Sequence, residues 1–285
     1  MFRLSILVLT FTLFACSPAE RPVEELTATS SGPEADAPVE PSRYNEYLWC
    51  KEGENFSEES LANLTQTWLG MSDEAGVEYF GVYSLSPRFT DPNFDRILLL
   101  VWPDKETRDK GWETYSAENI QAKLDEQYPG VEQCGGDNWA NVYGNTVYQP
   151  RVPSVTWDVE KSPTALVGYR FCSYNAGKEP KDLRQLVRGK FDSWLVEYEE
   201  GSGPSSYNWG YLAPDFDVET IERNEGVPPT FDYVWMDFWA NPTEAESGNA
   251  AWAETGFQSE FDAVATCTEP QSYDLVETRR MRPSA

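Results

Sequence analysis

Side chains capable of acid–base chemistry and anion binding lie on two similar stretches of this chain, residues 94–102 and 231–239. The second stretch carries Tyr233 and Asp237 beside tryptophans, and the first carries Arg96. A carboxylate or phenol can transfer protons, and a guanidinium can stabilise negative charge. No nucleophile motif accompanies them, so we assign no catalytic residue. The candidate ligand-binding residues are Arg96, Trp102, Arg170, Tyr233, Trp235, Asp237 and Trp239.

The 285 residues include no histidine. Its absence excludes Ser-His-Asp and Cys-His nucleophile pairs, His-ligated zinc and His-ligated haem. Acid–base catalysis would have to use Asp, Glu, Lys or Tyr. We therefore expect no cofactor and no metal site.

The charge of the chain restricts its partners. There are 48 acidic and 22 basic residues, for a net charge of −26. Binding to nucleic acid phosphates needs a positive field, so we expect no nucleic acid partner. The simplest interpretation of the charge is solubility. An aromatic content of 14%, with 11 tryptophans, indicates a folded globular part.

The first 15 residues predict an export signal. Arg3 precedes an apolar run that is too short to span a bilayer as a helix. The run ends in Leu13-Phe14-Ala15-Cys16, which resembles a bacterial lipobox. The resemblance implies that Cys16 is the first mature residue and carries acyl chains, which together hold a protein stably on a membrane. The alternative is an ordinary secretory signal. Ser17 follows the cysteine, which favours the outer membrane facing the periplasm if the source is Gram-negative.

Residues 16–43 predict a disordered tether. From Ser17 onwards the segment is rich in Pro, Glu, Ala, Ser and Thr and contains no aromatic residue. Such a sequence buries too little apolar surface to offset the entropy of ordering. We expect it to hold the folded part away from the membrane.

The folded part consists of two similar halves, residues 44–150 and 166–285, joined by a connector at 151–165. Each half predicts the order strand, helix, strand, strand, helix, strand, which is a ferredoxin-like unit. Strands are expected near 47–50, 77–85, 94–102 and 131–134, and Ser57 is expected to cap the first helix. Six matches recur in the same order, including Trp112 with Trp252, and they indicate a duplication. Residues 138–165 predict an extended segment with a candidate hairpin.

Four cysteines remain besides Cys16. Each half has one on its first strand and one on its last, and these strands are neighbours in a ferredoxin-like unit. We predict disulfides Cys50–Cys134 and Cys172–Cys267, which persist in an oxidising compartment. Each would stabilise the fold by roughly 4 to 5 kcal/mol in the chain-entropy model. A four-thiolate metal site is the alternative, but the close pairing of zinc knuckles is absent.

Two such units in one chain resemble the dimeric α+β barrel superfamily, in which paired sheets enclose a cavity. The resemblance covers residues 44–285 and implies a pseudo-dimeric α+β barrel in a monomer. Members include antibiotic-biosynthesis-type monooxygenases, haem-degrading enzymes and chlorite dismutases. The haem members generally use a histidine, so the resemblance implies no haem chemistry here. The alternative is two units side by side without a shared cavity.

Alternation along the paired strands divides their residues between two faces. Ile97, Leu99 and Val101, with their counterparts Val234, Met236 and Phe238, form an apolar face that we expect under the helices. The other face carries the candidate ligand-binding residues. We expect it to line the space between the sheets as a ligand site.

Simpler interpretations stand beside this one. Inward aromatic residues are commonly core, and Asp237 with an arginine can be a structural ion pair. The helical tryptophans Trp68, Trp112, Trp194 and Trp252 are expected to be core. Residues 197–200 are expected to be a solvated helix end, with calcium as the alternative.

Three functions remain open. The first is a non-enzymatic envelope lipoprotein that binds a small ligand or an envelope partner. The second is a structural or assembly lipoprotein. The third is a cofactor-independent oxygenase or isomerase, with Asp237 and Tyr233 as acid–base groups and Arg96 or Arg170 stabilising negative charge.

Overall fold

The computed structural model describes residues 40–135, 142–149, 151–216, 228 and 230–279. The predicted export signal, Cys16 and nearly all of the tether lie outside the described residues. None of the helices within these ranges has both the length and the hydrophobicity needed to cross a membrane.

The first half contains five strands and three helices within the described ranges. They follow in the order β1 (Arg43–Glu52), α1 (Glu58–Ala75), β2 (Gly81–Pro87), β3 (Arg96–Trp102), α2 (Lys105–Ala117), α3 (Ile120–Gln127), β4 (Glu132–Cys134) and β5 (Val142–Tyr148). Ser57 caps α1 as expected, because its side chain accepts from the Ser60 N–H. Asp104 caps α2 in the same way, accepting from the Thr107 N–H.

The second half repeats this order. Its elements are β6 (Thr164–Tyr174), α4 (Pro180–Leu186), the π-helical turn η2 (Val187–Phe191), α5 (Asp192–Ser202), β7 (Asn208–Pro214), β8 (Tyr233–Trp239), α6 (Pro242–Thr255), α7 (Gln258–Val264), β9 (Ala265–Cys267) and β10 (Gln271–Arg279). The continuous helix from α4 through η2 to α5 replaces α1. The four extra residues between Cys172 and Trp194 are thus accommodated in a longer helix that includes a π turn.

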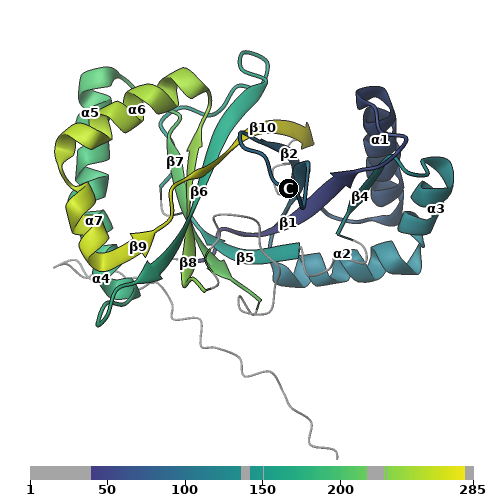
Figure 1. Ribbon diagram of the computed structural model, residues 1–285, viewed down its shortest axis with the longest axis horizontal. Coiled ribbons are helices and arrows are strands. Elements are labelled where there is room, and N and C mark those ends of the chain that lie inside the picture. Colours follow the sequence, from purple (N-terminus) through teal and green to yellow (C-terminus); the bar gives the residue numbers. More distant parts are fainter. Residues whose placement is uncertain (1–39, 136–141, 150, 217–227, 229, 280–285) are drawn as a thin grey trace, which may run out of the picture.

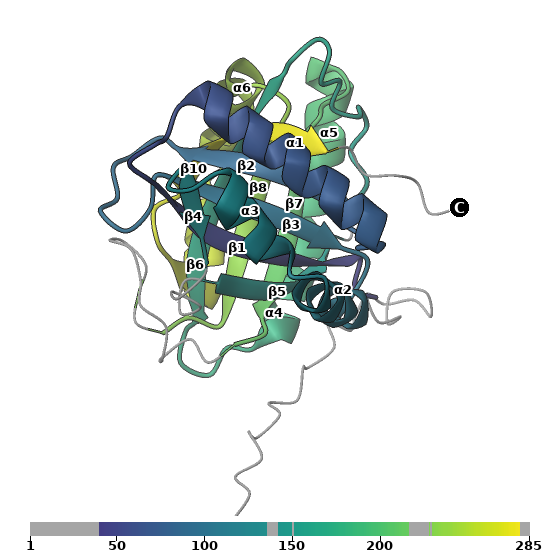
Figure 2. The same ribbon diagram turned by 90° about the vertical axis from the view of Figure 1, so that its right-hand side faces the viewer.

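The strands form one closed barrel. Around it the order is β2, β3, β1, β5, β7, β8, β6 and β10, and β10 pairs with both β6 and β2. The short strands β4 and β9 pair with the C-terminal ends of β1 and β6, respectively. The halves meet at two seams, β5 with β7 and β10 with β2. The helices cover the barrel on two opposite sides (Figures 1 and 2). This arrangement confirms the predicted pseudo-dimeric α+β barrel.

The extended segment predicted at residues 138–165 contains a strand of the barrel. Its first part is β5, which pairs with β1 over residues 43–48 and then with β7 of the other half. β5 is therefore a wall of the barrel and one of the two seams.

The assignment of the two strand faces was wrong. The barrel interior contains Ile97, Leu99 and Val101 together with Val234 and Met236. The face with Trp102, Tyr233 and Trp239 packs under the helices instead. Helices and barrel bury both faces of each strand, so polarity alone does not identify the inner one. The polar groups of the mixed face are paired by strands and loops, as Arg96 is by Glu132 of β4 and Asp237 by Tyr207 and Arg170.

The tryptophans that end β3 and β8 show which helical residues of the two halves correspond. Trp102 packs against Gly111 of α2, and Trp239 packs against Gly248 of α6. Both glycines lie seven residues after the N-cap of their helix, since the caps are Asp104 and Asn241. Tyr115 therefore corresponds to Trp252, and the sequence match of Trp112 with Trp252 is displaced by three residues.

Candidate functional site

A pocket opens inside the barrel, at the end where both disulfides lie. Its volume is about 50 Å³. One water needs roughly 10 to 15 Å³, so the pocket holds a few waters or one small organic group. It is lined by Tyr47, Trp49, Ile97, Tyr143, Asn145, Tyr169, Phe171, Leu212, Phe216, Phe231, Val234, Gln271 and Tyr273.

Aromatic rings form most of the pocket wall and pack against one another. Trp49 meets the edge of Tyr143 at 5.2 Å between ring centroids, and Phe171 meets Phe231 at 5.0 Å. Edge-to-face contacts of this kind hold rings in fixed orientations. The wall is therefore preformed and apolar, as ligand pockets commonly are.

Two asparagines face the interior next to this wall. Asn45 of β1 and Asn145 of β5 are directly paired in the sheet, and they are 2% and 4% exposed. The amide nitrogen of Asn45 donates to the Tyr47 hydroxyl at 3.1 Å. Neither side-chain oxygen, Asn45 Oδ1 or Asn145 Oδ1, receives a hydrogen bond within the described protein. Buried acceptors normally have a donor, so this pair calls for a water or a ligand.

Arg43 lies further along the same face of β1. Its Nη2 donates to Gln149 Oε1, whereas the buried Nε has no acceptor among the described residues. Burial lowers the pKa of Arg43, and the neighbouring groups that oppose this effect are Tyr83, Tyr47 and Tyr169. Burial likewise raises the pKa of both Tyr47 and Tyr169, so their hydroxyls are protonated at neutral pH. The interior thus contains a cation surrounded by neutral phenols.

None of the seven residues proposed from the sequence lines this pocket. Arg96 forms a bidentate ion pair with Glu132. Trp102 is fully buried beneath α2, and Tyr233 stacks on Tyr211 under the helices of the second half. Their expected position on the barrel interior was therefore wrong, because the interior is the opposite face.

Three of the seven come together around Asp237. Its Oδ1 accepts from the Tyr207 hydroxyl at 2.7 Å and from Trp235 Nε1 at 2.9 Å, and Arg170 Nε lies 3.9 Å from its Oδ2. Burial raises the pKa of Asp237, while these two hydrogen bonds and the arginine oppose the rise. The side chain is 24% exposed, so it contacts solvent as well as an arginine. The phenol beside it is Tyr207, where the sequence suggested Tyr233.

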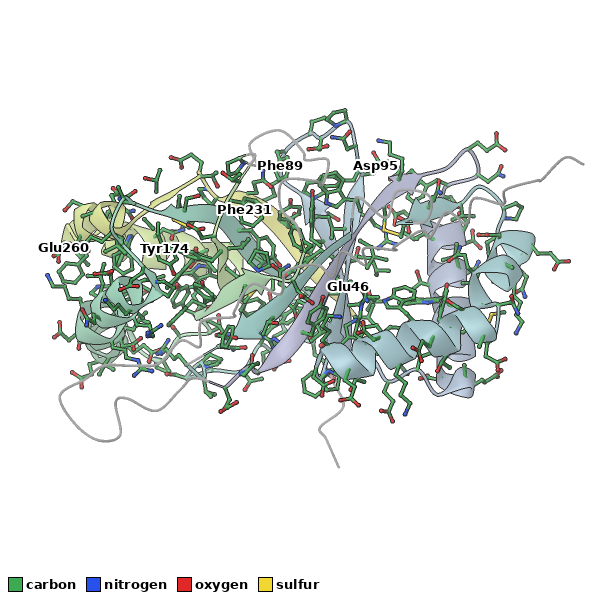
Figure 3. The ribbon with its side chains drawn as sticks, turned by 90° about the horizontal axis from the view of Figure 1, so that it is seen from below. Glu46, Phe89, Asp95, Tyr174, Phe231 and Glu260 are labelled. Carbon is green, nitrogen blue, oxygen red and sulfur yellow. A yellow bond between two sulfur atoms is a disulfide. The ribbon has the colours of Figure 1, made fainter. Side chains whose placement is uncertain are left out.

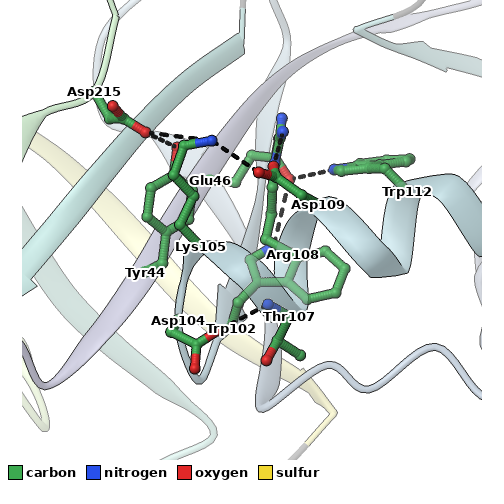
Figure 4. Close-up of polar contacts among 10 residues, drawn as sticks. All are labelled: Tyr44, Glu46, Trp102, Asp104, Lys105, Thr107, Arg108, Asp109, Trp112 and Asp215. Carbon is green, nitrogen blue, oxygen red and sulfur yellow. Dashed lines mark hydrogen bonds and ion pairs between the residues drawn. The ribbon is translucent and has the colours of Figure 1, made fainter. Parts of the chain in front are cut away.

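The sequence interpretation missed a second buried carboxylate, Glu46 of β1. This residue has no exposed surface, and it accepts from Trp112 Nε1 at 2.8 Å, Trp102 Nε1 at 3.3 Å and Arg108 Nε at 2.9 Å (Figure 4). Figure 3 shows it on the side of β1 toward α2, with Phe231 on the opposite side. Every donor is supplied by β3 or α2. The arrangement is a satisfied structural ion pair, and the only sequence signal was a glutamate within a buried strand.

Two other predictions concern the cysteines and the end of α5. The disulfides Cys50–Cys134 and Cys172–Cys267 are present, which confirms the pairing. Glu132 lies beside the first pair, but both sulfurs are bonded to each other and do not offer a metal two thiolates. Glu199 was expected in a solvated helix end, but it binds Arg151, Ser154 and Ser205 and is largely buried.

Comparison with known proteins gives structural likeness alone. No family model matches the sequence, and no curated protein matches it. A mutant chlorite dismutase from Candidatus Nitrospira defluvii is 10% identical, with a TM-score of 0.49 over 83% of this chain and 92% of that one. A candidate monooxygenase from Lactobacillus acidophilus NCFM is 9% identical, with a TM-score of 0.46 over 86% of this chain and 99% of that one. Likeness at this level concerns the fold alone.

Proposed function

We propose that this protein is an envelope-anchored lipoprotein whose barrel binds a small, largely apolar ligand without transforming it. The observation that carries the proposal is the aromatic pocket, which borders a buried amide oxygen, Asn145 Oδ1, with no protein donor. A structural core would be expected to fill such a space and pair such an atom. The folded chain is a monomer in this proposal, because one chain closes the barrel.

The anchor is the predicted acylated Cys16, followed by the tether. Several acyl chains on one cysteine hold a protein on a bilayer, and the acidic chain itself supplies no attraction to anionic lipid. Cys16→Ser is expected to move the protein from the membrane fraction to the soluble periplasmic fraction. A Cys16→Ser protein that stays with the membrane would contradict the anchor.

Ligand binding can be read from Trp49, which forms part of the pocket wall. A panel of small aromatic and aliphatic compounds is expected to include members that change the tryptophan fluorescence of the full chain. The change should be smaller in Trp49→Phe, which keeps a ring in the wall. A panel without any response, together with a pocket that stays filled by side chains in a crystal structure, would refute ligand binding.

A matched pair of substitutions separates pocket filling from general overpacking. Val234→Phe adds a ring inside the pocket, whereas Val101→Phe adds the same ring to the barrel interior away from the pocket lining. Both should lower stability by roughly 1 to 3 kcal/mol. Only Val234→Phe should abolish binding, and equal loss in both variants would contradict the location of the site.

A second candidate function rests on Asp237. A partly exposed carboxylate with a raised pKa, a phenol partner and an arginine nearby is suited to proton transfer. This supports an oxygenase or isomerase that needs no cofactor, with Arg170 stabilising negative charge. Asp237→Asn should reduce any such activity at least 100-fold. Unchanged turnover in Asp237→Asn would remove this candidate, and an absence of both ligand and activity would favour the structural or assembly role.

A further inference from the structure

The two interior asparagines give more information about the ligand than its size and apolarity. We infer that the pocket takes a small, uncharged aromatic compound bearing a hydroxyl group, that is, a compound of the phenol class. This inference rests on the proposed function, since it names the ligand of the same pocket. It combines three features of the barrel interior, which are the ring-lined wall, the unpaired amide oxygens and the buried arginine.

The amide oxygens require a hydrogen-bond donor. Asn145 lines the pocket, and its Oδ1 is buried without a partner in the described protein. Oδ1 of its sheet partner Asn45 is also buried without a donor, whereas Nδ2 of Asn45 donates a hydrogen bond to the Tyr47 hydroxyl. An unpaired buried acceptor destabilises a complex, so a ligand that donates a hydrogen bond here binds more tightly than one that cannot.

The tyrosines next to Asn145 make a hydroxyl a better donor than other groups. Tyr47 and Tyr169 border the same pocket, with their rings edge to face at 5.5 Å. A tyrosine is protonated at neutral pH even at its ordinary pKa, and burial raises the pKa of both side chains further. A protonated phenol can donate as well as accept. A ligand hydroxyl can therefore donate to Asn145 and accept from a tyrosine, using one oxygen atom for both bonds.

Arg43 excludes cationic donors. Its Nε is buried, its Nη2 donates to the neutral Gln149, and Tyr47 and Tyr169 are among its neighbours. An ammonium ligand would meet this charge in a medium of low dielectric, where repulsion is strong. A hydroxyl is neutral and is favoured further by nearby positive charge, which stabilises negative charge on its oxygen. The donor is thus a hydroxyl and not an ammonium group.

The wall and the volume set the body of the ligand. Trp49, Phe171 and Phe231 present rings in fixed orientations around the opening. Flat rings pack against such walls by offset and edge contacts. The space of about 50 Å³ inside the pocket accommodates a single small ring.

The test uses the full chain and three probes of similar size, phenol, toluene and benzylamine, at pH 7. Binding is measured by titration calorimetry. Phenol should bind about tenfold more tightly than toluene, because toluene leaves the amide oxygen unpaired. Benzylamine, which is cationic at this pH, should bind most weakly. This series needs no variant, so it does not depend on any substitution being tolerated.

Two matched variants locate the effect. Asn145→Leu should lower the affinity for phenol about tenfold and leave that for toluene unchanged. Asn208→Leu is the control, because Asn208 Oδ1 is also buried and unpaired but the residue does not line the pocket. It should leave both affinities unchanged.

The outcomes distinguish this inference from the proposed function. The inference is overturned if toluene or benzylamine binds as tightly as phenol. Ordered water would then satisfy the amide oxygens, and ligand binding itself would stand. An equal loss in Asn145→Leu and Asn208→Leu also overturns it. If none of the three probes binds but another member of the panel does, the inference is overturned and ligand binding stands.

Discussion

Glu46 is the residue whose environment depends most on long-range contacts. Three donors from β3 and α2 satisfy its carboxylate, and it has no exposed surface (Figure 4). Glu46→Gln should lower the free energy of unfolding by about 1.5 to 3 kcal/mol, because Arg108 loses its buried carboxylate partner and keeps only its ion pair with Asp109. Urea denaturation measures the loss.

The control is an exposed ion pair of the same type. Asp274→Asn breaks the pair with Arg88 on the surface of β10, where both side chains are more than a third exposed. Its cost should be about 0 to 1 kcal/mol. A similar small loss in Glu46→Gln would show that Asp109 and water are sufficient partners for Arg108.

Asp237 should make stability depend on pH. Its pKa is raised in the folded state, so the folded protein holds a proton that the unfolded chain releases near its ordinary value of about 3.9. Stability is therefore lost as the pH rises from the unfolded pKa to the folded one, and the cost is complete above it. Asp237→Asn keeps an oxygen that accepts from Tyr207 and Trp235 while removing the ionisation.

The variant should then be more stable than the original protein at pH 7 and lack this part of the pH dependence. Urea denaturation between pH 4 and pH 8 measures both. A variant that is less stable at pH 7 would mean that the ion pair with Arg170 outweighs the cost of burial.

At the residue scale, the sequence predicted some pairs of side chains and missed others. The four cysteines were paired correctly, because both pairs follow from strand order alone. Asp237 was expected near an arginine, and Arg170 is there. Tyr207 was missed because it lies just before β7, in a segment without a regular pattern.

At the scale of elements, the contact between each strand-end tryptophan and a helical glycine fixes how close the helix lies. A Cβ on Gly111 would lie 2.6 Å from the ring of Trp102, and one on Gly248 would overlap the ring of Trp239. Gly248→Ala should therefore lower the free energy of unfolding by about 1 to 3 kcal/mol, as α6 is pushed from the barrel. Thermal unfolding followed by circular dichroism measures it.

Gly70 of α1 provides the matched control. Nothing lies within 4 Å of a Cβ at this position, and the residue is inside a helix. Gly70→Ala should be neutral or stabilise by about 0.4 to 1 kcal/mol, since alanine restricts the unfolded chain. If the two substitutions have the same effect, the glycine contact does not set the helix position.

The order of elements was largely predictable from periodicity and capping residues. Ser57, Asp104 and the alternating runs located helices and strands within a few residues. The role of β5 was not predictable in this way. A strand that completes a barrel is defined by its partners β1 and β7, which lie far from it in sequence.

At the scale of the whole molecule, the two seams make the halves depend on each other. Residues 44–150 alone would leave free edges on β5 and β2, and the apolar barrel interior would be exposed to water. Unpaired edges and exposed apolar surface favour association. We expect this half to be aggregated or dimeric by light scattering, and to form a stable one-to-one complex when it is co-expressed with residues 151–285.

A protease site inserted between residues 151 and 163 gives the complementary control. The cut chain should remain a single particle with the fluorescence of the intact protein, because β5–β7 and β10–β2 pairing holds the halves together. A first half that is monomeric with cooperative unfolding would contradict the shared barrel.

The sequence by itself determined the duplication, the order of elements, the disulfide pairs and the exclusion of histidine chemistry. These follow from composition, spacing and local periodicity, which do not require knowledge of distant contacts. Only the tertiary structure decided which strand face is the interior. Both faces are buried, and closure through β5 and β10 turns the apolar face inward and leaves the mixed face packed under the helices. For the same reason the pocket is formed by residues that the sequence assigned to plain core, including Ile97 and Val234.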